Sequence, residues 1–160
     1  MLLVLLAVAL AAPLAAKDSL GVFSNWGAFR DPQFGRCYAI AKPLSDRRAR
    51  DYQPYASVGT WPKRGVRGQL HFRLSRKMAA GSAVRLRIGG RRFELTGGGG
   101  DAWARDKAMD AGIVAAMRSA ETMTVSAGDT RGRVLADRYD LSGAATAMDA
   151  ATVGCARIGR

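Results

Sequence analysis

The chain has 160 residues, of which 48% are apolar. This length suits one compact domain with a real core and argues against two full domains, because domains most often hold roughly 100 to 150 residues. The formal net charge of +12 favours attraction to polyanions and carries no information about the fold.

Residues 1–16, MLLVLLAVALAAPLAA, are uncharged, almost wholly apolar and end in small residues. The stretch is shorter than the roughly 20 residues that span a bilayer. We expect a secretory signal peptide cleaved before Lys17, which leaves residues 17–160 as a single exported domain without a transmembrane span. The usual basic start is missing, so either the true start lies upstream or the leader is atypical. A buried first helix of the fold is the alternative.

Export decides how the two cysteines are interpreted. In an oxidising compartment Cys37 and Cys155 are candidates for a disulfide that ties the beginning of the domain to its end. Two buried free thiols or an intermolecular bridge are the alternatives. Two cysteines and one distant histidine, without a C-x-x-C pair, make no metal site, and no cofactor motif is present.

The first half of the domain is rich in short strand patterns. We predict strands over residues 20–30, 36–41, 55–61 and 69–75, the first ended by the turn at Asp31-Pro32. In the last of these, Leu70, Phe72 and Leu74 face one way, so one side is core and the other is wet. The basic run over residues 42–53 has no apolar period and is expected to be a solvated loop.

A hairpin is predicted over residues 83–95, AVRLRIGGRRFEL. A two-residue turn at Gly89-Gly90 places apolar residues on one face of both strands, which supports this register. On the other face Arg85 lies opposite Glu94, and Arg87 lies opposite Arg92 as a like-charge pair that mildly destabilises a sheet. A destabilising pair of like charges can indicate a site where an anion binds. The candidate binding residues on this charged sheet face are Arg73, Arg85, Arg87, Arg91 and Arg92.

The glycine run over residues 97–100 lacks the Lys and Ser/Thr of a phosphate-binding loop and is expected to be a flexible connection. After it, Asp106 or Asp110 is expected to cap a helix with an apolar stripe that includes Ile113 and Met117. A second hairpin is predicted from the strand patterns at 122–126 and 134–141.

A last helix is expected to begin at Ser142 as its N-cap. Its predicted inward stripe ends on the second cysteine and consists of Leu141, Ala145, Met148, Thr152 and Cys155. Alanines in this helix allow a close approach to the sheet. The stripe therefore points Cys155 toward the strand that carries Cys37.

Catalytic signatures are weak. The single histidine, His71, lies on an alternating strand beside Arg73, and no G-x-S-x-G elbow accompanies it. The acidic residues are scattered and mostly adjacent to Lys or Arg, so a paired-carboxylate site has little support. Tyr, Trp and Arg interleave over residues 47–67, which suits stacking on a sugar or base, but a strand with a basic edge is the preferred interpretation.

Three stretches carry a family resemblance: DAGIVAAMRSAETMTVSA, RYDLSGAATAMDA and the early NWGAFRDPQFGRCYAIAK. With them the chain resembles the invasion-associated locus B family of exported proteobacterial proteins, as a distant, sphingomonad-like member. The resemblance implies an exported β-sandwich-like domain with no known enzymatic reaction, linked by name to host-cell invasion. The matching positions are Asp110, Ile113, Val114, Met117, Arg118, Leu141, Gly143, Ala144, Ala147 and Met148.

We therefore predict a mainly β, sandwich-like antiparallel domain with two short helices, located in the periplasm or secreted further. The expected function is non-enzymatic binding of an anionic envelope component (lipopolysaccharide, acidic lipid or glycan) or of a protein partner, and nucleic acid is not the expected partner. Two alternatives remain open. One is a small periplasmic hydrolase that uses His71, and the other is a structural or stress-related accessory that contacts only proteins.

Overall fold

The computed structural model describes residues 17–44 and 50–156, and the predicted signal peptide lies outside them. The described chain is mainly β with two helices, which confirms the expected fold class. The strands are β1 (Asp18–Phe23), β2 (Trp26–Asp31), β3 (Arg36–Ala41), β4 (Tyr55–Trp61), β5 (Val66–Arg73), β6 (Val84–Ile88), β7 (Arg91–Gly98), β8 (Asp101–Trp103), β9 (Thr122–Gly128) and β10 (Val134–Asp140). The helices are α1 (Lys107–Met117) and α2 (Ala144–Ala156), and a short 3-10 turn follows β4 at Pro62–Arg64.

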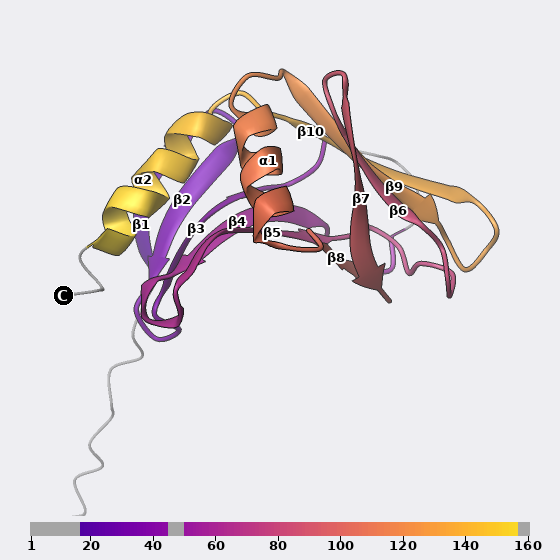
Figure 1. Ribbon diagram of the computed structural model, residues 1–160, viewed down its shortest axis with the longest axis horizontal. Helices are drawn as coiled ribbons and strands as arrows, with labels where there is room; N and C mark the ends of the chain where they lie inside the picture. Colours follow the sequence, from indigo (N-terminus) through magenta and orange to yellow (C-terminus); the bar gives the residue numbers. More distant parts are fainter. Residues whose placement is uncertain (1–16, 45–49, 157–160) are drawn as a thin grey trace, which may run out of the picture.

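All strand pairs are antiparallel and join in the order β1-β2-β3-β4-β5-β8-β7-β6-β9-β10. This sheet bends into two halves, because β7 pairs with β6 along its first part and with β8 along residues 96–98. The half with β9 and β10 turns over the inner face of β5 (Figure 1). There the rings of Phe72 and Tyr139, both fully buried, lie 5.7 Å apart between centroids. The two halves thus form a sandwich-like pair of layers around one core.

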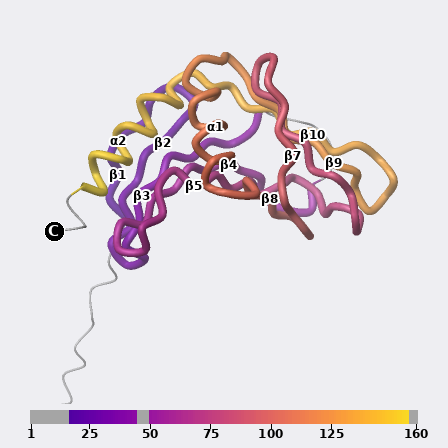
Figure 2. The backbone as a smooth tube through the Cα atoms, in the orientation of Figure 1, coloured from indigo at the N-terminus to yellow at the C-terminus, as the bar shows by residue number. Residues whose placement is uncertain are grey.

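Both helices cover the inner face of the first half. Helix α2 contacts β1 to β4, and α1 contacts β5 and the start of the second half. Small buried residues such as Ala28, Ala39 and Ala56 line the sheet beneath α2, so the helix approaches it closely. Figure 2 shows that α2, the last described element, returns beside β1 and β2, the first two strands. Within residues 17–44 and 50–156, neither helix lies on the outer face of either half.

The predicted strand over residues 20–30 is wrong, because this stretch is a hairpin. Strands β1 and β2 pair with Phe23 opposite Trp26, and only Ser24 and Asn25 remain for the turn. Ser24 has a φ of 51°, which is the left-handed conformation that tight two-residue turns require. The turn was missed because the aromatic residues alternate through it as they would in one continuous strand. Trp26 is fully buried, and its indole Nε1 donates a hydrogen bond to the carbonyl of Asp140 at 2.9 Å.

The hairpin of β6 and β7 has the predicted register. Val84 lies opposite Leu95, Leu86 opposite Phe93, and Arg87 opposite Arg92. The second predicted hairpin is also present, as β9 and β10. Alternation of buried and exposed residues sets both registers, because a slip by one residue would turn the apolar set to water.

The glycine run is part of a hairpin, which corrects the expected flexible connection. Gly97 and Gly98 belong to β7, and Gly99, with a φ of 61°, helps to turn the chain into β8. A Cβ at Gly97 would come within 2.6 Å of the Asp101 carbonyl oxygen, and a Cβ at Gly100 would overlap the ring of Tyr52. Close packing therefore requires glycine at 97 and 100, and the positive φ favours glycine at 99.

Helix α1 is capped by Asp106, whose carboxylate accepts from the backbone N–H of Met109 at 2.8 Å. Asp110 has a different role. Its buried carboxylate accepts from the backbone N–H of Leu70 at 2.8 Å, just beyond the point where β8 stops pairing with β5. Ile113 and Met117 are buried on the inward face, as predicted. Asp110 thus replaces a missing strand partner and attaches α1 to the sheet.

Helix α2 begins at Ala144 and not at Ser142, so the predicted N-cap is not formed. Instead the carboxylate of Asp140 accepts from the N–H of Ser142 at 2.7 Å. Gly143 has a φ of 85°, and a Cβ there would overlap the carbonyl oxygen of Phe23. The later start rotates the inward face. Thr152 is exposed, and the buried residues are Ala144, Ala147, Met148, Ala151 and Cys155.

The disulfide between Cys37 and Cys155 is present, which confirms the expected pairing. It joins β3 to the last turn of α2 with a Cα–Cα distance of 5.5 Å, and both cysteines are buried. The bond closes a loop with a sequence separation of 118 residues. It therefore fixes the end of the chain on the first half of the sheet.

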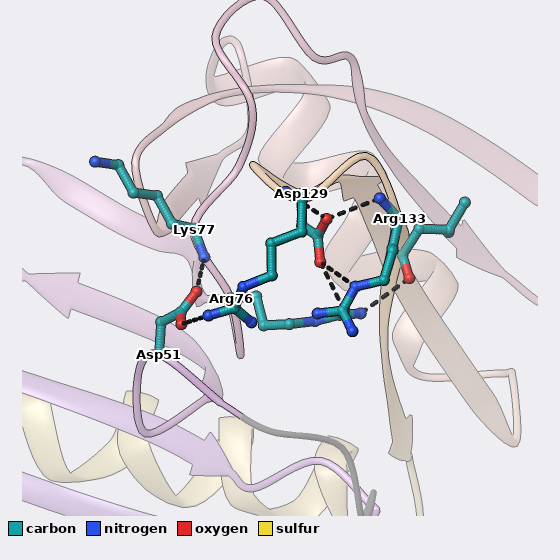
Figure 3. A network of polar contacts seen from close by, with 7 residues as sticks. Asp51, Arg76, Lys77, Asp129 and Arg133 are labelled. Carbon is teal, nitrogen blue, oxygen red and sulfur yellow. Dashed lines mark hydrogen bonds and ion pairs between the residues drawn. The ribbon is translucent and has the colours of Figure 1, made fainter.

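A buried ion pair lies where the chain crosses from β5 to β6 (Figure 3). Arg76 Nη1 donates to Asp129 at 2.7 Å, and the Arg76 and Asp129 side chains are only 4% and 2% exposed. Burial opposes ionisation of Asp129. The backbone N–H groups of Arg133 and Arg131, with the charges of Arg133 and Arg76, nevertheless hold its pKa below the usual value. The crossing segment is thereby fastened to the turn between β9 and β10.

The same segment is also held from the other side. The backbone N–H of Lys77 donates to Asp51 at 2.9 Å, and Arg131 reaches the other oxygen of Asp51 at 3.2 Å. The N–H of Ser75 donates to the buried carboxylate of Asp137 at 2.8 Å. Burial raises the pKa of Asp137, although the hydrogen bonds from Ser75 oppose this effect. Side chains of both halves of the sheet therefore satisfy the backbone of this crossing.

We expect the disulfide to contribute strongly to stability. Closing a loop of 118 residues restricts the unfolded chain, so Cys37→Ala/Cys155→Ala should lose up to about 5 kcal/mol of unfolding free energy. Urea denaturation followed by circular dichroism measures this loss, with the wild-type chain under reducing conditions as the control. A loss below roughly 1 kcal/mol would show that packing of α2 alone holds the C-terminal end.

We expect a pH-dependent effect at Asp110. Burial raises its pKa, with the charge of Asp106 adding to the rise and the N–H of Leu70 opposing it. A raised folded-state pKa means that the ionised form costs stability near neutral pH, and that this cost disappears as the pH falls through the folded pKa. Asp110→Asn keeps an acceptor oxygen and removes the charge.

Asp110→Asn should therefore be more stable than the wild type near neutral pH, and the difference should shrink in mild acid. Thermal denaturation over a pH series measures it. Asp106→Asn is the control with the opposite sign, because the pKa of Asp106 is lowered, chiefly by the N–H of Met109. A constant difference across the pH series would refute the role of the Asp110 charge.

Candidate anion-binding face

The outer face of the second half of the sheet carries a row of arginines. The strand registers place Arg92 of β7 beside Arg87 of β6, then Thr124 of β9, then Arg138 of β10. All three arginines are exposed, and the residues that flank Arg87 on β6 and Arg138 on β10 are buried. Neighbouring strands lie about 4.8 Å apart, so the row places three guanidinium groups across four strands.

A second row runs parallel to the first. It consists of Glu94, Arg85, Ser126 and Ala136 on the same four strands. The short side chains of Thr124 and Ser126 on β9 leave a shallow open groove of about 530 Å³ beside the arginines. Its lining includes Arg85, Arg87, Arg92, Glu94, Thr124 and Ser126. We name Arg85, Arg87, Arg92 and Arg138 the arginine face.

The four guanidinium groups of the arginine face make no hydrogen bond or ion pair with any residue in the ranges 17–44 and 50–156. Glu94 lies directly opposite Arg85, yet the two side chains form no ion pair there. Other arginines differ: Arg118 pairs with Asp149 at 2.6 Å, and Arg30 pairs with Asp18 at 2.6 Å. The arginine face thus presents unneutralised donors to solvent.

Two of the five predicted binding residues lie elsewhere. Arg91 points to the side of α1, where its Nη1 donates to the Gly112 carbonyl at 3.2 Å and its guanidinium lies 5.0 Å from the ring of Phe93. It lies opposite Ile88, a core position, so it shares the inward side of the hairpin. Arg73 belongs to β5 in the first half of the sheet. The structure therefore brings together Arg85, Arg87 and Arg92 of the predicted set.

Sequence reasoning missed Arg138. The alternation along β10 places Arg138 on the outer side, since its neighbours Asp137 and Tyr139 are buried. This alternation can be recognised in the sequence. The pairing of β6 with β9 cannot, because it joins strands separated by β7, β8 and α1 in the chain. Only this long-range pairing places Arg138 beside the predicted arginines.

His71 lies on the outer face of the first half, in a compact polar and aromatic cluster. Its Nε2 is 2.9 Å from Asp101 Oδ1, and Arg73 donates to the other oxygen of Asp101. The His71 ring stacks on Trp103 at 5.1 Å between centroids and meets the edge of Tyr55 at 5.4 Å. Burial raises the pKa of Tyr55, and the charge of Asp101 adds to this rise.

A hydrolase of the serine or cysteine type would need a hydroxyl or thiol nucleophile beside His71. Ser57 is its cross-strand neighbour on β4, but no hydrogen bond joins Ser57 or any other hydroxyl or thiol of the described residues to His71. In residues 17–44 and 50–156 no group of three His, Cys, Asp or Glu side chains is placed to hold a metal ion. Within the same ranges, neither helix is long and apolar enough to cross a membrane.

Comparisons with known proteins agree with this fold. The family model for the invasion associated locus B (IalB) protein matches residues 32–152, well over half of the chain. The crystal structure of invasion associated protein b from Bartonella henselae has a similar fold, with a TM-score of 0.55 and 14% sequence identity over 86% of this chain and 96% of that one. The search of curated proteins found no significant match. The chain therefore belongs to the invasion associated locus B family.

Proposed function

We propose that this protein is an exported, non-enzymatic component of the bacterial envelope that binds an anionic envelope molecule through the arginine face. Family membership supports an envelope protein. The observation that carries the binding proposal is the row Arg92, Arg87 and Arg138, which lies in register on adjoining strands with no described partner for its charges. The net charge of +12 acts in the same direction.

The energetics favour this proposal. Arg87 and Arg92 lie directly opposite each other, which costs the sheet stability. An anion between them would remove this repulsion and accept paired N–H bonds from planar guanidinium groups. Phosphate and carboxylate groups both have this geometry. Lipopolysaccharide, acidic phospholipid and acidic glycans repeat such groups, so each can engage several arginines of one row.

The groove beside Arg92, Arg87 and Arg138 gives room for a large ligand. Thr124 and Ser126 are half-buried, short and supply hydroxyl groups. Thr124 leaves room between Arg87 and Arg138, and Ser126 lies beside Arg85. The groove is open, which suits a surface or a polymer and not an enclosed small molecule. An acidic protein partner would meet the same groups.

We expect Arg87→Ala/Arg92→Ala to weaken binding to lipopolysaccharide or anionic vesicles by at least tenfold at low salt. Each lost charge-assisted hydrogen bond contributes roughly 1 kcal/mol or more, and two of them account for about that factor. Vesicle co-sedimentation or surface plasmon resonance measures it. Arg105→Ala/Lys107→Ala removes the same charge from exposed positions outside the arginine face and is the matched control.

Wild-type binding should also fall steeply as salt is raised, and the dependence should be shallower for the arginine variant. An equal loss of binding in the arginine variant and in its control would show that only the net charge of the protein matters, and not the position of these arginines. Absence of wild-type binding to lipopolysaccharide, acidic phospholipid and acidic glycan at low salt would contradict the proposal.

The hydrolase alternative has one supporting observation, the His71–Asp101 hydrogen bond, which resembles the base and orienting carboxylate of hydrolytic sites. If the protein hydrolyses an envelope substrate with this base, His71→Ala should abolish the activity. Full activity in His71→Ala would remove this alternative. Crosslinking in the periplasm distinguishes the accessory alternative. If the protein contacts only other proteins, the same partners should be crosslinked when the arginines of the arginine face are replaced by alanine.

A further inference from the structure

The outer face of the first half of the sheet is covered by flat aromatic rings. Phe29 lies across Gly27, where a Cβ would come within 2.8 Å of the ring, and Trp61 lies across Gly59, where a Cβ would come within 2.7 Å. The absence of side chains at these glycines lets the rings lie against the backbone. Trp103 completes this face on β8 and is 39% exposed, so it is the tryptophan that solvent reaches most.

One side of the Trp103 indole is held and the other side is open. His71, the cross-strand neighbour on β5, stacks on the indole with 15° between the planes. The neighbour on the opposite side is Thr96 of β7, whose side chain is too small to cover an indole. Beyond it the sheet bends away toward its second half. The indole is thus a fixed platform with one apolar face available.

Polar groups lie beside this platform in a fixed arrangement. The Asp101 carboxylate accepts one bond at each oxygen, from His71 and from Arg73, and it is 27% exposed. Carboxylate oxygens have further lone pairs, so Asp101 retains acceptor capacity. Arg73 is held in place by the ring of Tyr52, 3.9 Å from its guanidinium carbon, and is 31% exposed. Both a charged acceptor and a charged donor therefore border the indole.

We propose that Trp103, Asp101 and Arg73 form a carbohydrate-binding platform for a pyranose ring of a glycan. The apolar C–H face of a pyranose stacks on an exposed indole, while its hydroxyl groups donate to a carboxylate and accept from a guanidinium. The structure has all three components side by side on β5 and β8. The stacking alternative in the sequence concerned residues 47–67, and Arg73, Asp101 and Trp103 lie outside that range.

The position of Asp101 favours a sugar over a nucleic acid. A carboxylate beside the ring stack attracts hydroxyl donors and repels the phosphates that accompany nucleobases. The platform uses no residue of the arginine face. The platform proposal and the anion-binding proposal can therefore be refuted separately. Sugar binding at the platform should change little with salt, because the sugar needs no charge to bind there.

The test uses the mature chain with chito-oligosaccharide, malto-oligosaccharide and dextran as probes. In wild-type protein, saturation transfer to at least one of these sugars is expected, together with a saturable shift of the Trp103 indole N–H signal in proton–nitrogen NMR spectra. The indole signal of Trp26, which is buried and bonded to Asp140, should not move. Absence of transfer to all three sugars would overturn the proposal.

The variant Trp103→Leu keeps an apolar side chain and removes the platform, so saturation transfer should fall to background. Trp61→Leu is the matched control on the same face and should keep the transfer. Asp101→Asn keeps the shape of the site and should weaken the sugar affinity several-fold. Unchanged indole signals of Trp26 in each variant confirm that it is folded.

Two results would contradict the assignment. Transfer that persists in Trp103→Leu would place any sugar site elsewhere. A Trp103 shift caused by a single-stranded oligonucleotide, with none from the sugars, would assign the platform to base stacking instead. A steep loss of sugar binding with salt would assign the interaction to the arginines and also overturn it.

Discussion

The buried ion pair of Arg76 and Asp129 is the contact on which the shape of this protein depends. A single ten-stranded antiparallel sheet would otherwise leave one long apolar face in water. The crossing from β5 to β6 folds the sheet over, and there Arg76 bonds to Asp129 and Lys77 to Asp51 (Figure 3). Ser75 of the same crossing bonds to Asp137. Because an unpaired charge in that position would be costly, the two halves can separate only with the loss of the whole network.

This folding buries one side of the sheet and leaves two outer faces of different chemistry. The second half presents the arginine face, with charges that have no described partner. The first half presents aromatic rings that lie flat over glycines, with Asp101 and Arg73 beside Trp103. The two proposals assign a charged envelope molecule to one of these faces and a neutral sugar to the other. The disulfide and α2 support the first half and contribute no atom to either face.

Local patterns predicted the features that depend on near neighbours. The register of β6 and β7, the cap at Asp106 and the inward direction of Cys155 all follow from alternation, helical spacing or turn chemistry within a few residues. The errors arose where a distant residue decides the local structure. Trp26, which follows the Ser24 turn, bonds to the carbonyl of distant Asp140, and Gly100 in the turn of the glycine hairpin packs against Tyr52. Asp110 is explained only by the N–H of Leu70.

By itself the sequence determined the mainly β class, the pairing of Cys37 with Cys155 and the outward direction of Arg85, Arg87 and Arg92, because a period of two residues or a lone pair of cysteines suffices for each. Only the tertiary structure decided which of these charges share a surface. The pairing of β6 with β9 and of β5 with β8 adds Arg138 to the arginine face, moves Arg73 to the platform of Trp103 and turns Arg91 toward α1. The physical reason is that strand order is set by burial of the whole apolar face, to which every strand contributes and which no local segment specifies.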